Sequence, residues 1–177
     1  LFPRAHAVAY VMMAFRIAWF KVYQPLAYYA AYFTIRAEGS FNAPVILKGL
    51  ESQKAELARI AALEHSTAVE KGNATVIEVA AEMYLRGMEF LPIDLDRSDA
   101  SEFKMVDGKL LPPFNCIPAL GDAVAKEIVR ARDEHLFTSK EDLKKRGKVS
   151  QSIIDTMDSM GILKNMPDEE QISLFSF

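Results

Sequence analysis

FNCIPALGDAVAKEIVR, residues 114–130, is the stretch that decides the fold of the C-terminal part of the chain. Its first half holds a proline and a single glycine, Gly121, among apolar residues, which indicates a tight turn. Its second half has no helix breaker, and it predicts a helix over residues 122–133. The stretch therefore predicts a turn that leads directly into a helix.

This stretch resembles the helix-hairpin-helix pattern, in which a Gly-hydrophobic-Gly hairpin precedes a helix with Ala and Ile on its packed face. The resemblance implies binding to the backbone of duplex DNA, because the unpaired amides and the dipole at a helix N-terminus favour a phosphate. Such contacts carry no sequence information. The implied DNA-binding residues here are Ala119, Leu120, Gly121, Asp122, Ala123 and Val124, with Lys126 and Arg130 at helical spacing beside them.

Ala119 departs from the pattern, because it stands where the first glycine usually is. A positive φ at this position strains an alanine, so the turn would differ or the grip on phosphate would be weaker. The alternative for the whole stretch is a plain helical turn that packs on its neighbour.

A second hairpin is expected at Gly147, Lys148 and Val149, between helices predicted over residues 140–146 and 151–160, and Gly147 and Lys148 are counted with the implied DNA-binding residues. Ser139 and Ser150 are suitable N-caps for these two helices. The segment between the two serines is rich in basic residues, namely Lys140, Lys144, Lys145, Arg146 and Lys148. Residues 112–165 are therefore predicted to be a tandem helix-hairpin-helix domain, with a simple solvated charged surface as the alternative for the basic run.

Helices are also predicted over most of the chain before residue 87. The expected segments are 6–23, 25–36, 44–63 and 75–86, the last of them starting with a capping box formed by Thr75 and Glu78. The segment between residues 64 and 73 is expected to be a loop.

The periodicity changes after Gly87, where β-forming residues predict strands at 88–95 and 101–106. Asp107-Gly108 is a tight hairpin signal that leads into a further strand at 109–111. The predicted fold class is therefore mainly α with a small antiparallel β element.

The composition is that of a globular protein, with 177 residues, 50% of them hydrophobic and 25% charged. A single cysteine, Cys116, fits a reducing compartment, and a cytoplasmic location is expected. The formal net charge of −3 gives no general attraction to nucleic acid, so a DNA contact needs a local site.

The apolar run at residues 5–15 has neither a basic leader nor a cleavage site, and Arg16, Lys21 and Pro25 interrupt the segment after it. We interpret the run as a buried helix and expect no membrane partner. The residues before position 37 are apolar on nearly every side, so they belong either to an ordinary core or against a domain upstream of Leu1. The absence of an initiator Met suggests a fragment of a longer chain.

The chain ends with a short apolar motif after a polar linker. The motif resembles the peptide that binds the bacterial sliding clamp, and its residues are Gln171, Ile172, Ser173, Leu174 and Phe175. Leu174 and Phe175 would fill an apolar pocket of the clamp while Gln171 forms a hydrogen bond at its rim. A disordered apolar tail, or a strand docked on its own domain, is the alternative.

Several segments in consistent order are similar to the C-terminal part of the PolC-type bacterial DNA polymerase III alpha subunit. They are residues 2–10, 16–21, 82–97, 111–121, 137–143 and 146–148. The resemblance implies four regions: final fingers helices (1–39), a helical connector with a small sheet (40–111), the tandem hairpins (112–165) and a tail that binds the clamp (166–177).

The resemblance also implies the chemistry of the parent enzyme, a DNA-directed DNA polymerase that uses Mg²⁺ and deoxynucleoside triphosphates. Its catalytic carboxylates would lie upstream of Leu1, so no catalytic or metal-binding residue and no cofactor are expected in this chain. Arg4, His6 and Tyr10 would lie near the incoming nucleotide.

Two other functions remain as alternatives to a polymerase fragment that binds duplex DNA, the sliding clamp and the rest of its chain. One is a stand-alone helix-hairpin-helix module for DNA binding or repair, and the other is a helical interaction domain whose hairpins only pack. Asp94, Asp96 and Asp99 have an alternating spacing that superficially suggests a metal loop, but the glycine that an EF-hand loop requires is absent.

Overall fold

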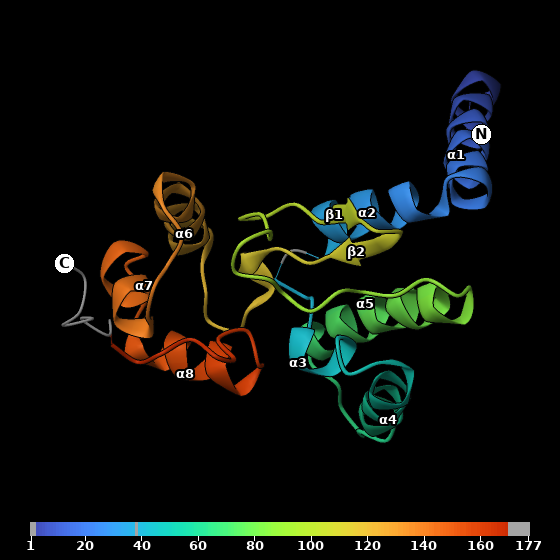
Figure 1. Cartoon of the computed structure of the whole chain (residues 1–177). Helices are drawn as coiled ribbons and strands as arrows, with labels where there is room; N and C mark the ends of the chain where they lie inside the picture. Colours follow the sequence, from blue (N-terminus) through green and yellow to red (C-terminus); the bar gives the residue numbers. More distant parts are fainter. Residues whose placement is uncertain (1–2, 38, 170–177) are drawn as a thin grey trace.

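The computed structural model describes residues 3–37 and 39–169. Within these residues the chain is mainly helical with one two-stranded antiparallel sheet, as the sequence predicts (Figure 1). The elements are α1 (Arg4–Tyr23), α2 (Pro25–Arg36), α3 (Ala43–Ile46), α4 (Leu50–Ala61), α5 (Ala68–Leu85), β1 (Lys104–Val106), β2 (Lys109–Leu111), the 3₁₀ helix η1 (Phe114–Cys116), α6 (Asp122–Glu134), α7 (Lys140–Arg146) and α8 (Gln151–Ser159).

Two of the predicted helices have different boundaries in the structure. The helix predicted over 44–63 is divided into α3 and α4, because Gly49 between them has a φ of +95° that no helix tolerates. Helix α5 begins with a capping box at Thr67 and Glu70, so the one predicted at Thr75 and Glu78 is wrong. The Thr75 hydroxyl instead donates to the carbonyl of Lys71 inside the helix.

The β-hairpin forms at the predicted turn, with Asp107 and Gly108 both at positive φ and Met105 opposite Leu110. The strand predicted over residues 88–95 is wrong, because Phe90 contributes only an isolated bridge to Leu110. The chain then turns away, since the Asp94 carboxylate accepts hydrogen bonds from the amides of Asp96 and Arg97.

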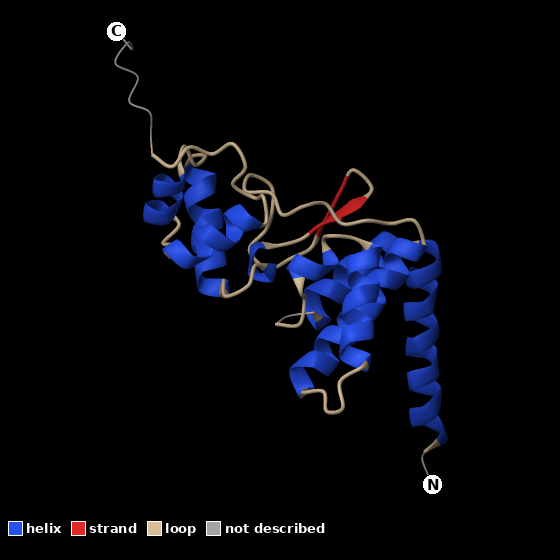
Figure 2. Cartoon of the chain, turned by 90° about the horizontal axis from the view of Figure 1, so that it is seen from below, coloured by secondary structure: helices blue, strands red, loops and turns tan. Residues whose placement is uncertain are grey.

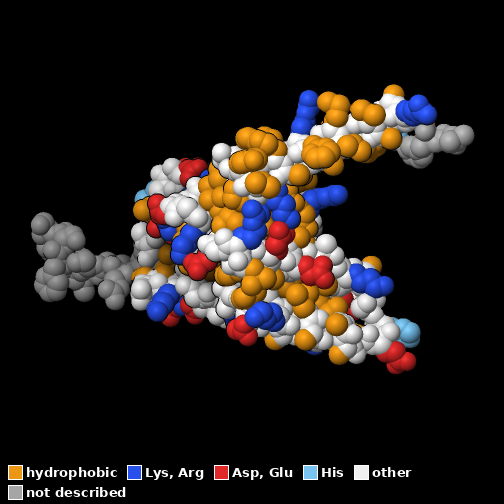
Figure 3. Space-filling view, turned by 90° about the vertical axis from the view of Figure 1, so that its right-hand side faces the viewer, with side chains coloured by type: hydrophobic (Ala, Val, Ile, Leu, Met, Phe, Trp, Pro, Cys, Tyr) orange, Lys and Arg blue, Asp and Glu red, His pale blue; other side chains and the backbone are white. Residues whose placement is uncertain are grey.

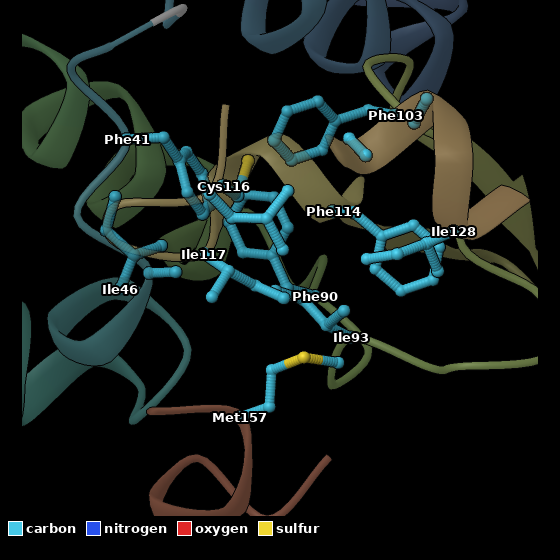
Figure 4. Close-up of a cluster of buried hydrophobic side chains, with 14 of the residues drawn as sticks. Phe41, Ile46, Phe90, Ile93, Phe103, Phe114, Cys116, Ile117, Ile128 and Met157 are labelled. Carbon is cyan, nitrogen blue, oxygen red and sulfur yellow. The ribbon is translucent and has the colours of Figure 1, made fainter. Parts of the chain in front are cut away.

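A continuous hydrophobic core runs from Tyr29 in α2 to Leu163 after α8. At its centre, the rings of Phe33, Phe41, Phe90 and Phe103 pack with centroids 5.1 to 6.0 Å apart. Phe114, Ile117 and Ile128 continue this core toward the C-terminal helices (Figure 4). The core therefore joins the segment before Pro112 to the one after it.

A buried arginine also connects these two segments. The Arg132 guanidinium of α6 donates to the carbonyl oxygen of Ser98 at 2.6 Å. The Ser98 hydroxyl in turn donates to the carbonyl of Pro112 at 2.8 Å. Both side chains are buried, so these hydrogen bonds fix α6 against the loop at residues 94–98.

Helix α1 projects from the rest of the molecule and has no buried residue (Figures 1 and 2). Its apolar side chains lie open on the surface, with Phe15 73% exposed and Trp19 51% exposed (Figure 3). The interpretation of this segment as an ordinary core helix is therefore wrong, because the rest of the described chain does not cover it.

The C-terminal end of α1 is bound to α5 and to the residue that follows α5. Lys21 forms an ion pair with Glu82 of α5 at 2.8 Å, and Arg86 donates to the Lys21 carbonyl at 2.9 Å. Within the described residues, α1 is also the one helix long and apolar enough to cross a membrane, a criterion that the core helix of a larger soluble protein meets as well.

Candidate nucleic-acid interface

The first hairpin presents the N-terminus of α6 to solvent. Ala119 has a φ of +64°, the left-handed conformation for which the usual glycine would be suited, and the buried Leu120 anchors the turn. Gly121 is the N-cap and has no side chain to cap the helix. The first amide that donates within α6 is that of Ala125, to the Gly121 carbonyl at 3.0 Å.

The amides of residues 121–124 therefore have no acceptor within residues 3–37 and 39–169. Pro118, Ala119 and residues 121–123 are exposed, so a ligand can approach these amides. The Asp122 side chain lies at the same end and accepts a hydrogen bond from the Asn115 amide at 3.0 Å. Its negative charge opposes an incoming phosphate, which limits the strength of the site.

The second hairpin repeats this geometry one residue later than the sequence predicts. Lys148 has a φ of +53°, Val149 is buried, and Ser150 is the N-cap of α8. These three residues correspond to Ala119, Leu120 and Gly121 of the first hairpin. The Ser150 side chain accepts from the Ile153 amide at 3.4 Å, so one amide of α8 already has a partner.

Gly147 stands outside this correspondence and ends α7. A Cβ atom at residue 147 would lie 2.7 Å from the Leu143 carbonyl oxygen and 3.2 Å from a methyl of Val149. The lack of a side chain at this position is thus explained by close packing inside the hairpin.

The cations predicted to assist the hairpins are largely paired with Glu127 of α6. Its carboxylate lies 2.8 Å from the Arg130 guanidinium and 2.8 Å from Lys148 Nζ in the second hairpin. Hydrogen bonds from Arg130 and Lys148 lower the pKa of Glu127 to about 2, so it is ionised throughout the range in which DNA binding is measured. Lys126 is exposed and forms no ion pair within the described residues.

Glu127 was not among the residues predicted for the interface. The ion pair with Arg130 could have been predicted, because residues three positions apart lie on the same face of a helix. The pair with Lys148 depends on how the two hairpins are arranged in space, and no local pattern contains that information.

Most of the basic run before Ser150 also has structural partners. Lys140 pairs with Asp158 at 3.2 Å, and Lys144 donates to Gln151 at 3.1 Å. Arg146 pairs with Asp142 at 2.9 Å and lies over the ring of Phe137. These basic side chains therefore bind neighbouring groups around α7. A basic patch available to phosphates would require them to be unpaired.

The other candidate residues lie apart from the hairpins. Arg4, His6 and Tyr10 are exposed on the first two turns of α1, with the ring centroids of His6 and Tyr10 4.5 Å apart. The predicted clamp residues Gln171, Ile172, Ser173, Leu174 and Phe175 lie outside the described residues.

Two of the three aspartates considered as metal ligands, Asp94 and Asp99, bind other groups of the chain. Asp94 binds the Arg97 side chain at 2.8 Å, in addition to the two backbone amides. Burial raises the pKa of Asp99, but hydrogen bonds from the amides of Ser101 and Glu102 and the pair with Lys104 together hold that pKa below its usual range. No cluster of metal-binding side chains forms within residues 3–37 and 39–169.

Comparison with known proteins agrees with the hairpin geometry. Residues 87–172 match the family described as "Helix-hairpin-helix motif". The chain is 51% identical over 175 residues to the DNA polymerase III PolC-type of Thermotoga maritima. It is 48% identical over 176 residues to that of Clostridium perfringens and 52% identical over 177 residues to that of Pediococcus pentosaceus.

These similarities cover 99% of this chain but only a small part of the relatives, 13% of the Thermotoga maritima protein and 12% of the other two. The matched region includes α1 to α5 as well as the hairpins, so the relationship is not limited to one common motif. The chain belongs to the PolC-type DNA polymerase III family.

Proposed function

We propose that this chain supplies sequence-independent binding of duplex DNA to a replicative DNA-directed DNA polymerase. The observation that carries the proposal is the first hairpin, where the positive φ of Ala119 and the bare N-cap Gly121 leave the first amides of α6 open. A phosphate at this position gains hydrogen bonds and the favourable end of the helix dipole. The second hairpin has the same backbone form and offers a further contact to the duplex backbone.

The stand-alone DNA-binding or repair module is less well supported. The helix-hairpin-helix match begins at residue 87, whereas the similarity to PolC-type polymerases also covers the helices before it. A module that binds DNA only through its hairpins does not require α1. This helix is apolar on nearly every side, and the other described residues do not cover it.

Replacing Gly121 by Val tests the proposal. A Cβ at this position meets no atom of the protein within 4 Å, and the backbone conformation is an ordinary extended one, so the fold is expected to tolerate the change. The side chain would stand where the phosphate approaches the amides. We expect binding to random-sequence duplex to weaken about tenfold, which corresponds to the loss of roughly one charge-assisted hydrogen bond.

Fluorescence anisotropy with labelled duplex measures this effect, and thermal unfolding shows whether the variant is folded. Unchanged DNA affinity in a folded variant would exclude the first hairpin as a phosphate site. A plain helical turn that only packs on its neighbour gives that outcome.

A second prediction concerns Glu127, which holds two cations of the hairpins. Replacing Glu127 by Gln is expected to strengthen duplex binding several-fold, because Arg130 and Lys148 become available to phosphates. The salt dependence of log Kd is expected to steepen by about one to two, since each phosphate neutralised releases a counterion. Glu78→Gln is the matched control, because it removes the same charge from an exposed position on α5.

Equal effects of Glu127→Gln and Glu78→Gln would mean that only the net charge matters. A weaker binding in Glu127→Gln would mean that Glu127 mainly keeps the two hairpins in their relative position.

We further propose that residues 1–39 are the last helices of the polymerase fingers, with Arg4, His6 and Tyr10 near the incoming nucleotide. The uncovered surface of α1 supports an arrangement in which the rest of the polymerase chain packs around it. In that enzyme, Mg²⁺ and deoxynucleoside triphosphates act in the catalytic part of the chain, and the setting is the bacterial cytoplasm.

The motif at residues 171–175 is proposed to bind the sliding clamp. The support is its sequence, QISLF, together with its position after the polar segment 165–170. A short peptide of this kind gives a dissociation constant on the order of micromolar, about −8 kcal/mol. Linking it to DNA-binding hairpins raises the overall affinity for a clamp that encircles the same duplex.

A further inference from the structure

A cleft lies directly beside the first hairpin and has a volume of about 500 Å³. One wall consists of residues 115–121, which include the hairpin itself. The other walls come from the end of α2, the loop at residues 39–42, Asn73 of α5, and the segment at Ser101 and Phe103. We call this the hairpin cleft. Segments far apart in the sequence thus meet at the proposed phosphate site.

Among the described residues, the lining of the hairpin cleft contains no charged side chain. Three of its neutral polar side chains, Ser40, Asn42 and Asn73, are half-buried and have no hydrogen-bond partner within the described part of the chain. Two other polar side chains are occupied. The Thr34 hydroxyl accepts from the Phe103 amide, and Asn115 donates to Asp122.

The remaining lining is apolar. Phe41, Phe103 and Leu120 are more than nine-tenths buried and form part of the cleft surface, and the labelled Phe41 and Phe103 lie close together in Figure 4. An apolar surface with a few neutral donors and acceptors suits a ligand that has both an apolar ring and exposed oxygens. A deoxyribose-phosphate unit has this chemistry.

We propose that the hairpin cleft binds the sugar-phosphate backbone of the DNA strand, next to the phosphate held by the first hairpin. This inference rests on the proposed function and extends its footprint onto the connector. Asn42 and Asn73 donate to backbone oxygens, and the sugar ring lies against the apolar lining. Because an asparagine side chain is uncharged, these hydrogen bonds neutralise no phosphate. They therefore add affinity without adding to the salt dependence of binding.

The test compares two variants that add the same charge to the same helix. Asn73→Asp keeps the shape of the side chain but turns a donor into a negative group inside the cleft. Thr75→Asp places the same charge on the exposed face of α5, two residues away. We expect Asn73→Asp to weaken duplex binding more than tenfold and Thr75→Asp less than twofold.

The double variant Asn42→Ala and Asn73→Ala supplies a second readout. We expect binding to weaken about five- to tenfold while the slope of log Kd against log salt concentration stays the same. By contrast, Lys126→Ala is expected to reduce that slope by about one if Lys126 neutralises a phosphate. Thermal unfolding of each variant shows that the full chain remains folded.

Equal weakening by Asn73→Asp and Thr75→Asp would overturn the inference, because long-range repulsion alone gives that result. Unchanged affinity in the folded alanine double variant would overturn it as well. The Gly121→Val variant distinguishes a failure of the cleft inference from a failure of the proposed DNA-binding function. If Gly121→Val weakens binding and the cleft variants do not, the hairpin binds DNA without the cleft.

Discussion

Replacing Leu174 and Phe175 together by alanine is expected to abolish binding of the chain to the bacterial sliding clamp. These two side chains are the apolar anchors of the proposed peptide, and buried aromatic and aliphatic anchors contribute roughly 2 kcal/mol or more each at an interface. From an affinity on the order of micromolar, such a loss moves the dissociation constant into the millimolar range. Surface plasmon resonance with immobilised clamp measures the change.

The matched control is Ser176→Ala, which changes the residue next to the motif and is expected to leave clamp binding intact. Duplex affinity in the absence of clamp is expected to remain the same in both variants, because the hairpins end before the tail. Clamp binding that survives the double substitution would show that another surface makes the contact.

Replacing Gly147 by Ala is expected to destabilise the chain by about 1–3 kcal/mol, the usual cost of overpacking a tight site. The new Cβ would lie 2.7 Å from the Leu143 carbonyl oxygen, a backbone atom of α7 that cannot move away without disturbing the helix. The midpoint of thermal unfolding is expected to fall by several degrees. Circular dichroism at 222 nm follows this transition.

Gly121→Ala is the matched control, because its Cβ meets no protein atom within 4 Å. The two glycines thus separate stability from binding: Gly147 is expected to affect the fold, and Gly121 the contact with DNA. Equal unfolding midpoints in the two alanine variants would contradict the packing assigned to Gly147.

The sequence was sufficient to place both hairpins to within one residue, because their determinants are local. A turn, a buried residue and a helix start lie within a few positions, and Ser139 and Ser150 cap their helices as expected. The two-residue turn at Asp107 and Gly108 was predictable for the same reason. Family resemblance added the order of the segments along the chain, which local patterns do not contain.

Other features depend on contacts between distant residues and were not predictable from local patterns. The ion pair of Lys148 with Glu127 joins positions 21 residues apart, and the hairpin cleft joins α2, α5 and residues 115–121. The strand expected at residues 88–95 has suitable residues but pairs only at Phe90, because the Asp94 turn removes the rest from the sheet. Local propensity is a weak guide where tertiary contacts compete.

The exposure of α1 gives the protein a natural optical reporter. Trp19 is the single tryptophan of the sequence, and half of its surface lies open on a helix that the described chain leaves uncovered. Indole emission shifts toward the blue when water is excluded from the ring. The emission wavelength of Trp19 in the unlabelled chain therefore shows whether an added upstream polymerase segment covers this helix. The rate of the shift shows how quickly it does so.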